Sequence, residues 1–192
     1  DLTAPRKAVY EFTDFQGVTK SQLTSLIDTY EVVSVDLFDT VIMRRTLFPT
    51  DVFELVELRL REKDIFIDGF SQKRLEAEKE LGKSTVPTLF EIYSYLLTKC
   101  PVPDVEAEDL VRLEWETDLN LVVQRRELCE LLQEIQKQGK EIYIVSDTFY
   151  NKKQLAELLE HCSVTWYQGI LSSSDYRTSK TQNLFGILKE KL

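Results

Sequence analysis

The stretch VVSVDLFDT, which runs from Val32 to Thr40, decides how this chain is organised. Its first residues are apolar and mostly β-branched, a composition typical of a strand buried in a parallel sheet. The apolar run reaches an acidic residue, Asp36, which we therefore expect at the carboxyl end of the strand. An ionised carboxylate in that position is costly unless a cation pairs with it.

Two later segments have the same character. EIYIVS, residues 141–146, is an apolar run that ends in Ser146, and GILS, residues 169–172, is a weaker third candidate. Strands that end in polar residues and are followed by helices predict an α/β fold with a doubly wound parallel sheet, which binds ligands at the carboxyl ends of its strands. We expect the three strands to be parallel neighbours, with the strand of Asp36 in the centre.

A long segment with helical periodicity separates the first two strands, whereas a crossover connection needs only ~12 residues. Thr50 is placed to cap a first helix, and Thr88 and Glu91 fit a capping box for a later one. The last helix of the segment stops before Gly139, a residue typical of helix ends. We therefore predict that residues 50–138 are helical throughout.

This excess of helix predicts two structural units. Residues 44–126 would form a helical cap over the strand ends, inserted into a Rossmann-like α/β core that comprises residues 1–43 and 127–192. Two helices would complete the core: residues 152–161, and an amphipathic helix over residues 183–192 that opens near Lys180. The chain lacks an initial methionine and ends inside that helix, so we expect a fragment of a longer protein.

Composition limits the partners. Of the 192 residues 43% are hydrophobic and 30% charged, and the formal net charge is -9, which argues against a nucleic-acid partner. No apolar run approaches the ~20 residues that span a membrane, so no membrane partner is expected. The three cysteines lack the spacing of a zinc site or a disulfide framework, which favours reduced thiols and a cytoplasmic location.

Three side chains could carry chemistry together. Asp36 could attack phosphorus, the hydroxyl of Ser146 could bind a phosphoryl oxygen, and Lys180 could offset the negative charge. Taken singly, each has an ordinary explanation as a loop carboxylate, a helix cap or a solvated surface lysine. Their order along the chain, with a helical segment between the first and the second, makes the combination informative.

This order resembles the haloacid dehalogenase (HAD) superfamily, whose members are mostly phosphatases and phosphotransferases. The motif Asp36-Leu37-Phe38-Asp39-Thr40 is similar to the family's first motif, the strand ending in Ser146 to its second, and Lys180 to its third. The resemblance covers the chain from Val32 to its end.

The resemblance implies a role for each matching residue. Asp36 and Lys180 would be catalytic, and a Mg²⁺ cofactor would be held by the Asp36 carboxylate and the Phe38 carbonyl. The cap would choose a small phosphorylated substrate and shield it from water. The residues implied to contact that substrate are Thr40, Ser146 and Asp147.

Two departures from the family pattern keep alternatives open. Phosphatases of the family usually carry a second aspartate where this chain has Phe38, and the dehalogenase branch has an aromatic residue there. The acidic metal ligands of a fourth motif are also missing, so we expect the chain by itself to be inactive. Three hypotheses follow: a Mg²⁺-dependent phosphatase that forms an aspartyl-phosphate at Asp36, a metal-free dehalogenase-like hydrolase, and a non-catalytic module of a larger protein.

Overall fold

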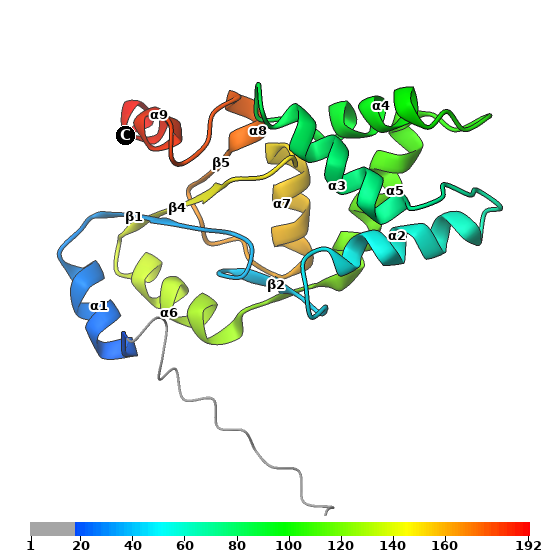
Figure 1. The fold of residues 1–192 in the computed structure, drawn as a ribbon. Coiled ribbons are helices and arrows are strands. Elements are labelled where there is room, and N and C mark those ends of the chain that lie inside the picture. The colour runs from blue at the N-terminus through cyan, green and yellow to red at the C-terminus, as the bar shows by residue number, and fades with distance from the viewer. Residues whose placement is uncertain (1–17) are drawn as a thin grey trace, which may run out of the picture.

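The computed structural model describes residues 18–192, so the first 17 residues of the predicted core lie outside the described residues. A three-stranded parallel sheet stands at the centre (Figure 1). It is formed by β1 (Val32–Val35), β4 (Glu141–Ser146) and β5 (Gly169–Ser172), in the order β1-β4-β5. The predicted α/β fold and the parallel pairing of the three strands are confirmed.

The predicted central place of the Asp36 strand is wrong. Among the described residues β4 is the central strand, and β1 pairs with β4 alone. Each connection moves one strand further in the same direction, so the order in space follows the order in the chain. As an edge strand, β1 is only partly buried, whereas the last three residues of β4, residues 144–146, are buried.

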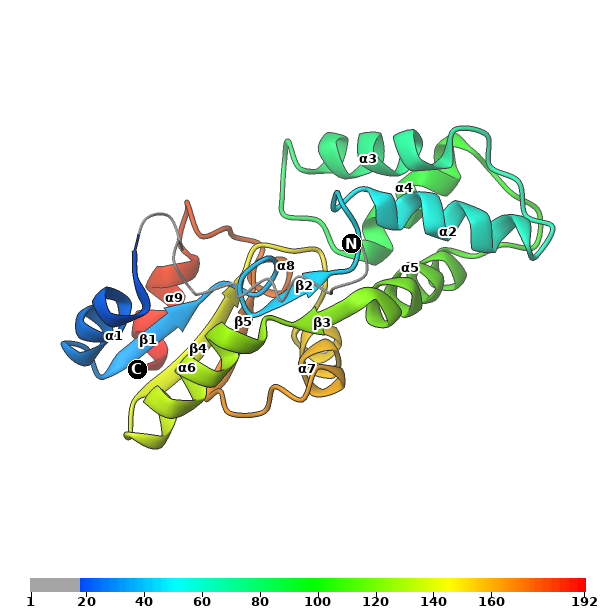
Figure 2. The same ribbon diagram turned by 90° about the horizontal axis from the view of Figure 1, so that it is seen from below.

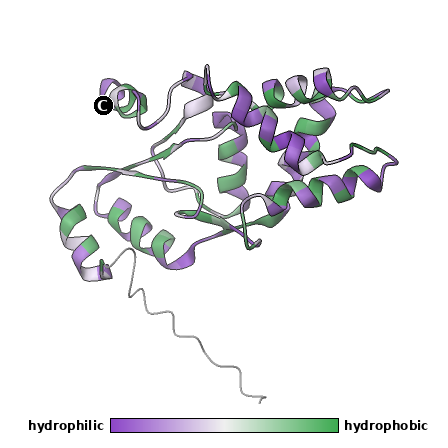
Figure 3. Ribbon diagram, viewed as in Figure 1, coloured by the Kyte–Doolittle hydropathy of each residue, from purple (hydrophilic) through white to green (hydrophobic). Residues whose placement is uncertain are grey.

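The alternation of side chains along β4 gives the sheet two apolar faces. Ile142 and Ile144 belong to the large core, which the amphipathic helices α6 (Arg126–Lys137) and α7 (Lys152–His161) help to form. Val145 points the other way and packs with Leu171 of β5 and with α9 (Leu184–Lys191). Figure 3 shows hydrophobic and hydrophilic residues alternating around α6 and α7, as a sheet-covering helix requires. Helix α1 (Lys20–Asp28), which was not predicted, adds Ile27 to the large core.

Four helices form an insertion beyond one end of the sheet, and Figure 2 shows them grouped together. We call α2–α5 the helical insertion. Its members are α2 (Asp51–Arg61), α3 (Phe70–Leu81), α4 (Leu89–Lys99) and α5 (Ala107–Leu121). The boundaries of the proposed core and cap remain a prediction.

A short antiparallel pair of strands corrects the expectation that residues 50–138 are helical throughout. β2 (Ile42–Arg44) enters the helical insertion and β3 (Val122–Gln124) leaves it, with Ile42 paired to Gln124. Strands of three residues carry too little periodicity to be recognised in a sequence. Their pairing depends on contact between segments that lie about 80 residues apart in the chain.

The helix caps agree with the sequence in one case and differ in another. In α4 the Glu91 amide donates to Thr88 Oγ1 at 3.2 Å and the Thr88 amide donates to the Glu91 carboxylate at 2.8 Å, which confirms the capping box. Thr50 makes no side-chain cap to α2. The carboxylate of Asp51 instead accepts from the amides of Leu47 and Phe48 and orders the loop before the helix.

A buried ion pair lies at the centre of the helical insertion. Arg74 of α3 is fully buried and donates two hydrogen bonds to Glu114 of α5, at 2.8 and 2.9 Å. The hydroxyl of Tyr93 donates to the same carboxylate at 2.5 Å. The Arg74 guanidinium also lies 4.7 Å from the ring of Phe149, which belongs to the loop after β4. The pair thus joins the helical insertion to the sheet.

Within residues 18–192, no helix is both long and apolar enough to cross a bilayer.

Loss of the buried pair should be costly. Glu114→Ala leaves the buried charge of Arg74 with the more exposed Glu78 as its remaining carboxylate partner. We therefore expect the free energy of unfolding to fall by about 3–5 kcal/mol, measured by urea denaturation. Glu130→Ala, which breaks the exposed Arg126–Glu130 pair of α6, is the matched control and should change little. Equal effects of the two substitutions would contradict a special role for the buried pair.

Candidate active site

An ion pair between Asp36 and Lys180 marks the carboxyl end of the sheet. The Lys180 amine donates to Asp36 Oδ1 at 2.5 Å, although the two residues are 144 positions apart. The same oxygen accepts the amide of Leu37 at 2.8 Å. The side chains of Asp36 and Lys180 are 45% and 21% exposed, so the pair is open to a molecule from solvent.

Lys180 reaches this place from a turn rather than from a helix start. It lies before α9, which begins at Leu184, so the expectation that Lys180 opens the terminal helix is wrong. The side chain of Gln182 accepts from the Ser179 amide at 3.2 Å, and the Leu184 amide donates to the Ser179 carbonyl at 3.1 Å, which keeps these residues in turns. The Asp147 carboxylate accepts the Lys180 amide at 2.9 Å and so connects this turn to the end of β4.

Ser146 has a buried hydroxyl that finds no hydrogen-bond partner within the described part of the chain. Its counterpart in the register of the sheet, Ser172 of β5, is also buried, yet its hydroxyl donates to the Tyr150 carbonyl at 2.5 Å. Buried polar groups are normally paired. The hydroxyl of Ser146 is therefore an exception, which the hydroxyls of Thr46 and Ser71 share.

The register of the sheet brings Ser146 to the same edge as Asp36. Val35 aligns with Ile144, so Asp36 follows beside Val145 and next to Ser146. The ion pair adds Lys180 to this edge. The catalytic and phosphate-binding roles assigned to the three residues stay predictions.

The loop after Asp36 turns sharply. The amides of Val41 and Ile42 both donate to the Leu37 carbonyl, at 2.9 and 3.0 Å, and Asp39 adopts a left-handed φ of 56°. Thr40 lies inside this turn, with its amide 3.4 Å from the same carbonyl. The ring of Phe38 contacts the Arg44 guanidinium, 4.3 Å from the ring centroid. Phe38 therefore places an aromatic ring at the position where phosphatases of the superfamily that the motif resembles carry their second carboxylate.

A cavity of about 450 Å³ opens beside these residues and is bounded by the helical insertion on one side and the strand-end loops on the other. Arg44 lines it, but its charge is already paired with Asp118 through bonds of 2.5 and 2.6 Å. A second cavity of about 460 Å³ lies between α3 and α4 and contains none of the predicted site residues, so we assign no role in the site to it. The lining residues of the first cavity are Phe38, Asp39, Arg44, Pro49, Glu78, Val86, Pro87, Asp147, Thr148, Phe149, Ser173 and Ser179.

The ligands for a magnesium ion are incomplete. Residues 18–192 contain no group of three or more His, Cys, Asp or Glu side chains that could hold a metal ion. The two ligands implied by the resemblance, the Asp36 carboxylate and the Phe38 carbonyl, fall short of the near-octahedral oxygen shell of Mg²⁺. The described residues therefore do not by themselves fit the ion.

Sequence reasoning missed several residues of the site. Arg44 and Phe149 line the cavity, and Ser173 fixes the loop after β4 by accepting the Thr148 amide at 2.8 Å. For Arg44 a signal was available, because it ends the otherwise apolar segment VIMR directly after the first motif. The serines of residues 172–174 carry no comparable signal.

Comparisons with known proteins bear on the fold. No protein-family model and no curated protein sequence matches the chain. Among solved structures, the HAD-hydrolase YfnB from Bacillus subtilis, bound to magnesium, is 16% identical with a TM-score of 0.57, over 85% of this chain and 74% of that one. A 2-haloacid dehalogenase from Pseudomonas syringae pv. tomato DC3000 gives 16%, a TM-score of 0.57, and coverage of 84% and 72%.

A third solved structure is the L-2-haloacid dehalogenase from Xanthobacter autotrophicus with chloropropionic acid covalently bound. It is 14% identical with a TM-score of 0.52, and the match covers 84% of this chain and 64% of that one. At these identities the likeness concerns the fold. The chain has the fold of the hydrolases to which it is similar.

The unpaired hydroxyl of Ser146 can be tested by comparing alanine substitutions at Ser146 and at Ser172. Ser146→Ala removes a buried group without a partner, so the free energy of unfolding should stay the same or rise by up to about 1 kcal/mol. Ser172→Ala removes a hydrogen-bonded hydroxyl from the matching position and should lower it by about 1 kcal/mol. Chemical denaturation of both variants measures the difference; a larger loss for Ser146→Ala would show that its hydroxyl serves the fold.

Proposed function

We propose that this chain, which has the fold of the HAD superfamily, forms the core and cap of a hydrolase with Asp36 as its nucleophile and a small phosphorylated metabolite as its substrate. The observation that carries the proposal is the 2.5 Å pair between Asp36 and Lys180 at the end of the sheet. It lies next to a cavity of about 450 Å³, whose lining includes the chain neighbours Phe38, Asp147 and Ser179.

The two carboxylate oxygens of Asp36 differ in their contacts. Both hydrogen bonds recorded for the Asp36 carboxylate among residues 18–192 fall on Oδ1, one from Leu37 and one from Lys180. Oδ2 is therefore the oxygen that attacks phosphorus. As its bond to phosphorus forms, the bond between phosphorus and the leaving-group oxygen breaks, and an aspartyl-phosphate results. Water then attacks that phosphorus and releases inorganic phosphate and the Asp36 carboxylate.

The other residues would stabilise charge. The Lys180 ammonium would offset the charge that Asp36 and the phosphoryl oxygens bring together, and the Ser146 hydroxyl would donate to one of those oxygens. Asp147 would keep Lys180 in place through the backbone amide that it accepts. Phe38 cannot move a proton, so the leaving group would have to take its proton from water or leave as an anion.

Magnesium is a further part of the proposal. It is supported by the magnesium bound in the Bacillus subtilis structure and by the carboxylate of Asp36. Because the described residues supply too few ligands, we derive no step of the reaction through the ion. Assays with and without Mg²⁺ test this part separately.

A dehalogenase-like reaction is the second candidate, and Phe38 is the observation that favours it. In that case Asp36 would attack carbon, displace a halide and form an ester that water hydrolyses, without a metal. Two of the similar structures are haloacid dehalogenases. A non-catalytic module is the third candidate, and it would turn over neither class of substrate.

The first test concerns Asp36. In the full-length gene product, Asp36→Asn should abolish turnover of an aryl phosphate, an alkyl phosphate and a 2-haloacid, whichever of these the wild type accepts, because an amide is a poor nucleophile. Glu130→Gln, at an exposed carboxylate of α6 that does not line the cavity, is the control and should retain turnover. Phosphatase activity that survives Asp36→Asn would show that the nucleophile is misassigned.

The second test separates the candidates through Phe38. If the protein is a phosphatase that lacks its usual acid, Phe38→Asp should raise turnover of an alkyl phosphate by up to ~10²-fold, the lower range for general acid catalysis. Nitrophenyl phosphate should respond less, since its leaving group needs little protonation. Phe38→Asn is the control, because asparagine has the shape of aspartate but cannot act as an acid.

In a dehalogenase or a binding module the same substitution should bring no gain. It would replace a ring that packs against Arg44 and Tyr150, so the melting temperature should fall for Phe38→Asp and Phe38→Asn alike. A gain that Phe38→Asn shares would contradict the acid/base explanation.

A further inference from the structure

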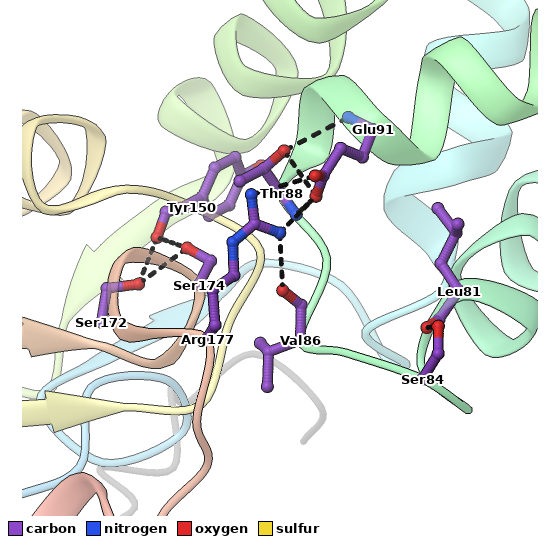
Figure 4. Close-up of polar contacts among 9 residues, drawn as sticks. All are labelled: Leu81, Ser84, Val86, Thr88, Glu91, Tyr150, Ser172, Ser174 and Arg177. Carbon is purple, nitrogen blue, oxygen red and sulfur yellow. Dashed lines mark hydrogen bonds and ion pairs between the residues drawn. The ribbon is translucent and has the colours of Figure 1, made fainter.

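Arg177 connects the loop that carries Lys180 to the helical insertion. Its guanidinium donates to both oxygens of the Glu91 carboxylate, at 2.5 and 2.9 Å, and to the Val86 carbonyl at 3.1 Å. Figure 4 shows the guanidinium between these two groups. Glu91 lies in the first turn of α4, whereas Arg177 is three positions before Lys180. The contact therefore joins elements that are 86 residues apart.

The Lys180 loop, residues 177–183, has few other polar anchors. Within the described part of the chain, the loop is held through Arg177, through Lys180 and through the Thr178 amide, which donates to the Ser173 carbonyl at 3.2 Å. The other hydrogen bonds of Thr178 and Ser179 stay local, to Gln182, Thr181 and the start of α9. Arg177 is thus one of a few anchors of the Lys180 loop, beside the Asp147 carboxylate, which accepts the Lys180 amide.

The backbone of Arg177 is held in a conformation that it would rarely adopt alone. Its φ is 53°, in the left-handed region, although it is not glycine. Arg177 ends the short helix α8 (Ser173–Tyr176) in this conformation, and its amide donates to the Ser173 carbonyl. The forked contact with Glu91 adds a second constraint through the side chain, because arginine presents its donors in a planar array that matches a carboxylate.

The partner carboxylate is fixed in turn. Glu91 completes the capping box with Thr88, and its pKa is lowered to about 2, chiefly by the hydrogen bond from Arg177, so it stays ionised at neutral pH. The amide of Leu89, in the same turn of α4, donates to the Phe149 carbonyl at 3.1 Å. The start of α4 therefore contacts both the loop after Ser146 and the loop of Lys180.

We propose that Arg177 is a positioning residue, whose pair with Glu91 seats the start of α4 on the strand-end loops and holds the Lys180 amine beside Asp36. The chemistry of Lys180 rests on the proposed function, but the positioning itself does not. Because both partners are about half exposed, at 45% and 40%, the pair should add little to stability. Its effect should appear in the geometry of the site.

Four single variants of the full-length gene product, and the double variant that combines Arg177→Ala with Glu91→Gln, test this role. Arg177→Ala removes the contact, and Arg177→Lys keeps the charge without the fork. Glu91→Gln removes the carboxylate charge, while glutamine can still complete the capping box. Arg112→Ala is the control, because it breaks an exposed ion pair with Asp109 that lies wholly within α5.

Amide hydrogen exchange is the readout that needs no activity. Arg177→Ala and Glu91→Gln should speed exchange at least about tenfold in residues 177–183 while the melting temperature stays close to that of the wild type, and the double variant should add little to either. Arg177→Lys should restore part of the protection. Unchanged exchange in residues 177–183 would overturn the proposal, as would equal loosening by Arg112→Ala.

Kinetics gives the second readout. Arg177→Ala should lower kcat by about tenfold to a hundredfold with a smaller change in KM, because a displaced lysine loses transition-state stabilisation more than binding. Arg177→Lys should recover part of kcat. If the wild type hydrolyses no phosphate ester, the proposed function fails, and hydrogen exchange alone then decides the role of Arg177. A wild-type phosphatase whose kcat is unaffected by Arg177→Ala would contradict the positioning role directly.

Discussion

The pairing of Asp36 with Lys180 is the interaction on which the arrangement of the site depends. Asp36 follows an apolar strand and is 45% exposed, and the chain supplies its cation from Lys180, 144 residues later. Two parallel strands, the loop after Ser146 and the turns before α9 all lie between the two residues in the chain. The Asp36–Lys180 pair requires all of these segments in their folded positions, so the site exists only in the folded chain.

The helical insertion is bound to the sheet by charge as well as by apolar contact. Arg74 pairs with Glu114 and Arg44 pairs with Asp118, and in each pair at least one side chain is fully buried. Both pairs reach the loop after β4. Arg74 lies against the ring of Phe149, and Asp118 accepts the hydroxyl of Tyr150 at 3.0 Å. Buried pairs demand fixed geometry, so they hold the wall of the cavity in one shape.

Some features that cost stability lie near Asp36, and others, such as the left-handed Asp64, Asp104 and Ser163, lie elsewhere. Ser146 keeps a buried hydroxyl without a partner in the described residues, and Arg177 and Asp39 adopt left-handed backbone conformations. The loops between them are tied together by Asp147, which accepts the amide of Lys180. Such features normally mark sites where a protein gives up stability for function.

Local patterns in the sequence determined the main elements. Residues 141–146, 152–161 and 169–172 form the predicted strands and helix, because periodicity and capping residues act over short range. The motifs also predicted Asp36, Ser146 and Lys180 as site residues, and the structure pairs Asp36 with Lys180. Tertiary structure alone decided that β4 is the central strand, that β2 pairs with β3, and that Arg177 meets Glu91. These outcomes depend on contacts between segments some 80 or more residues apart, and no local pattern encodes which of them meet.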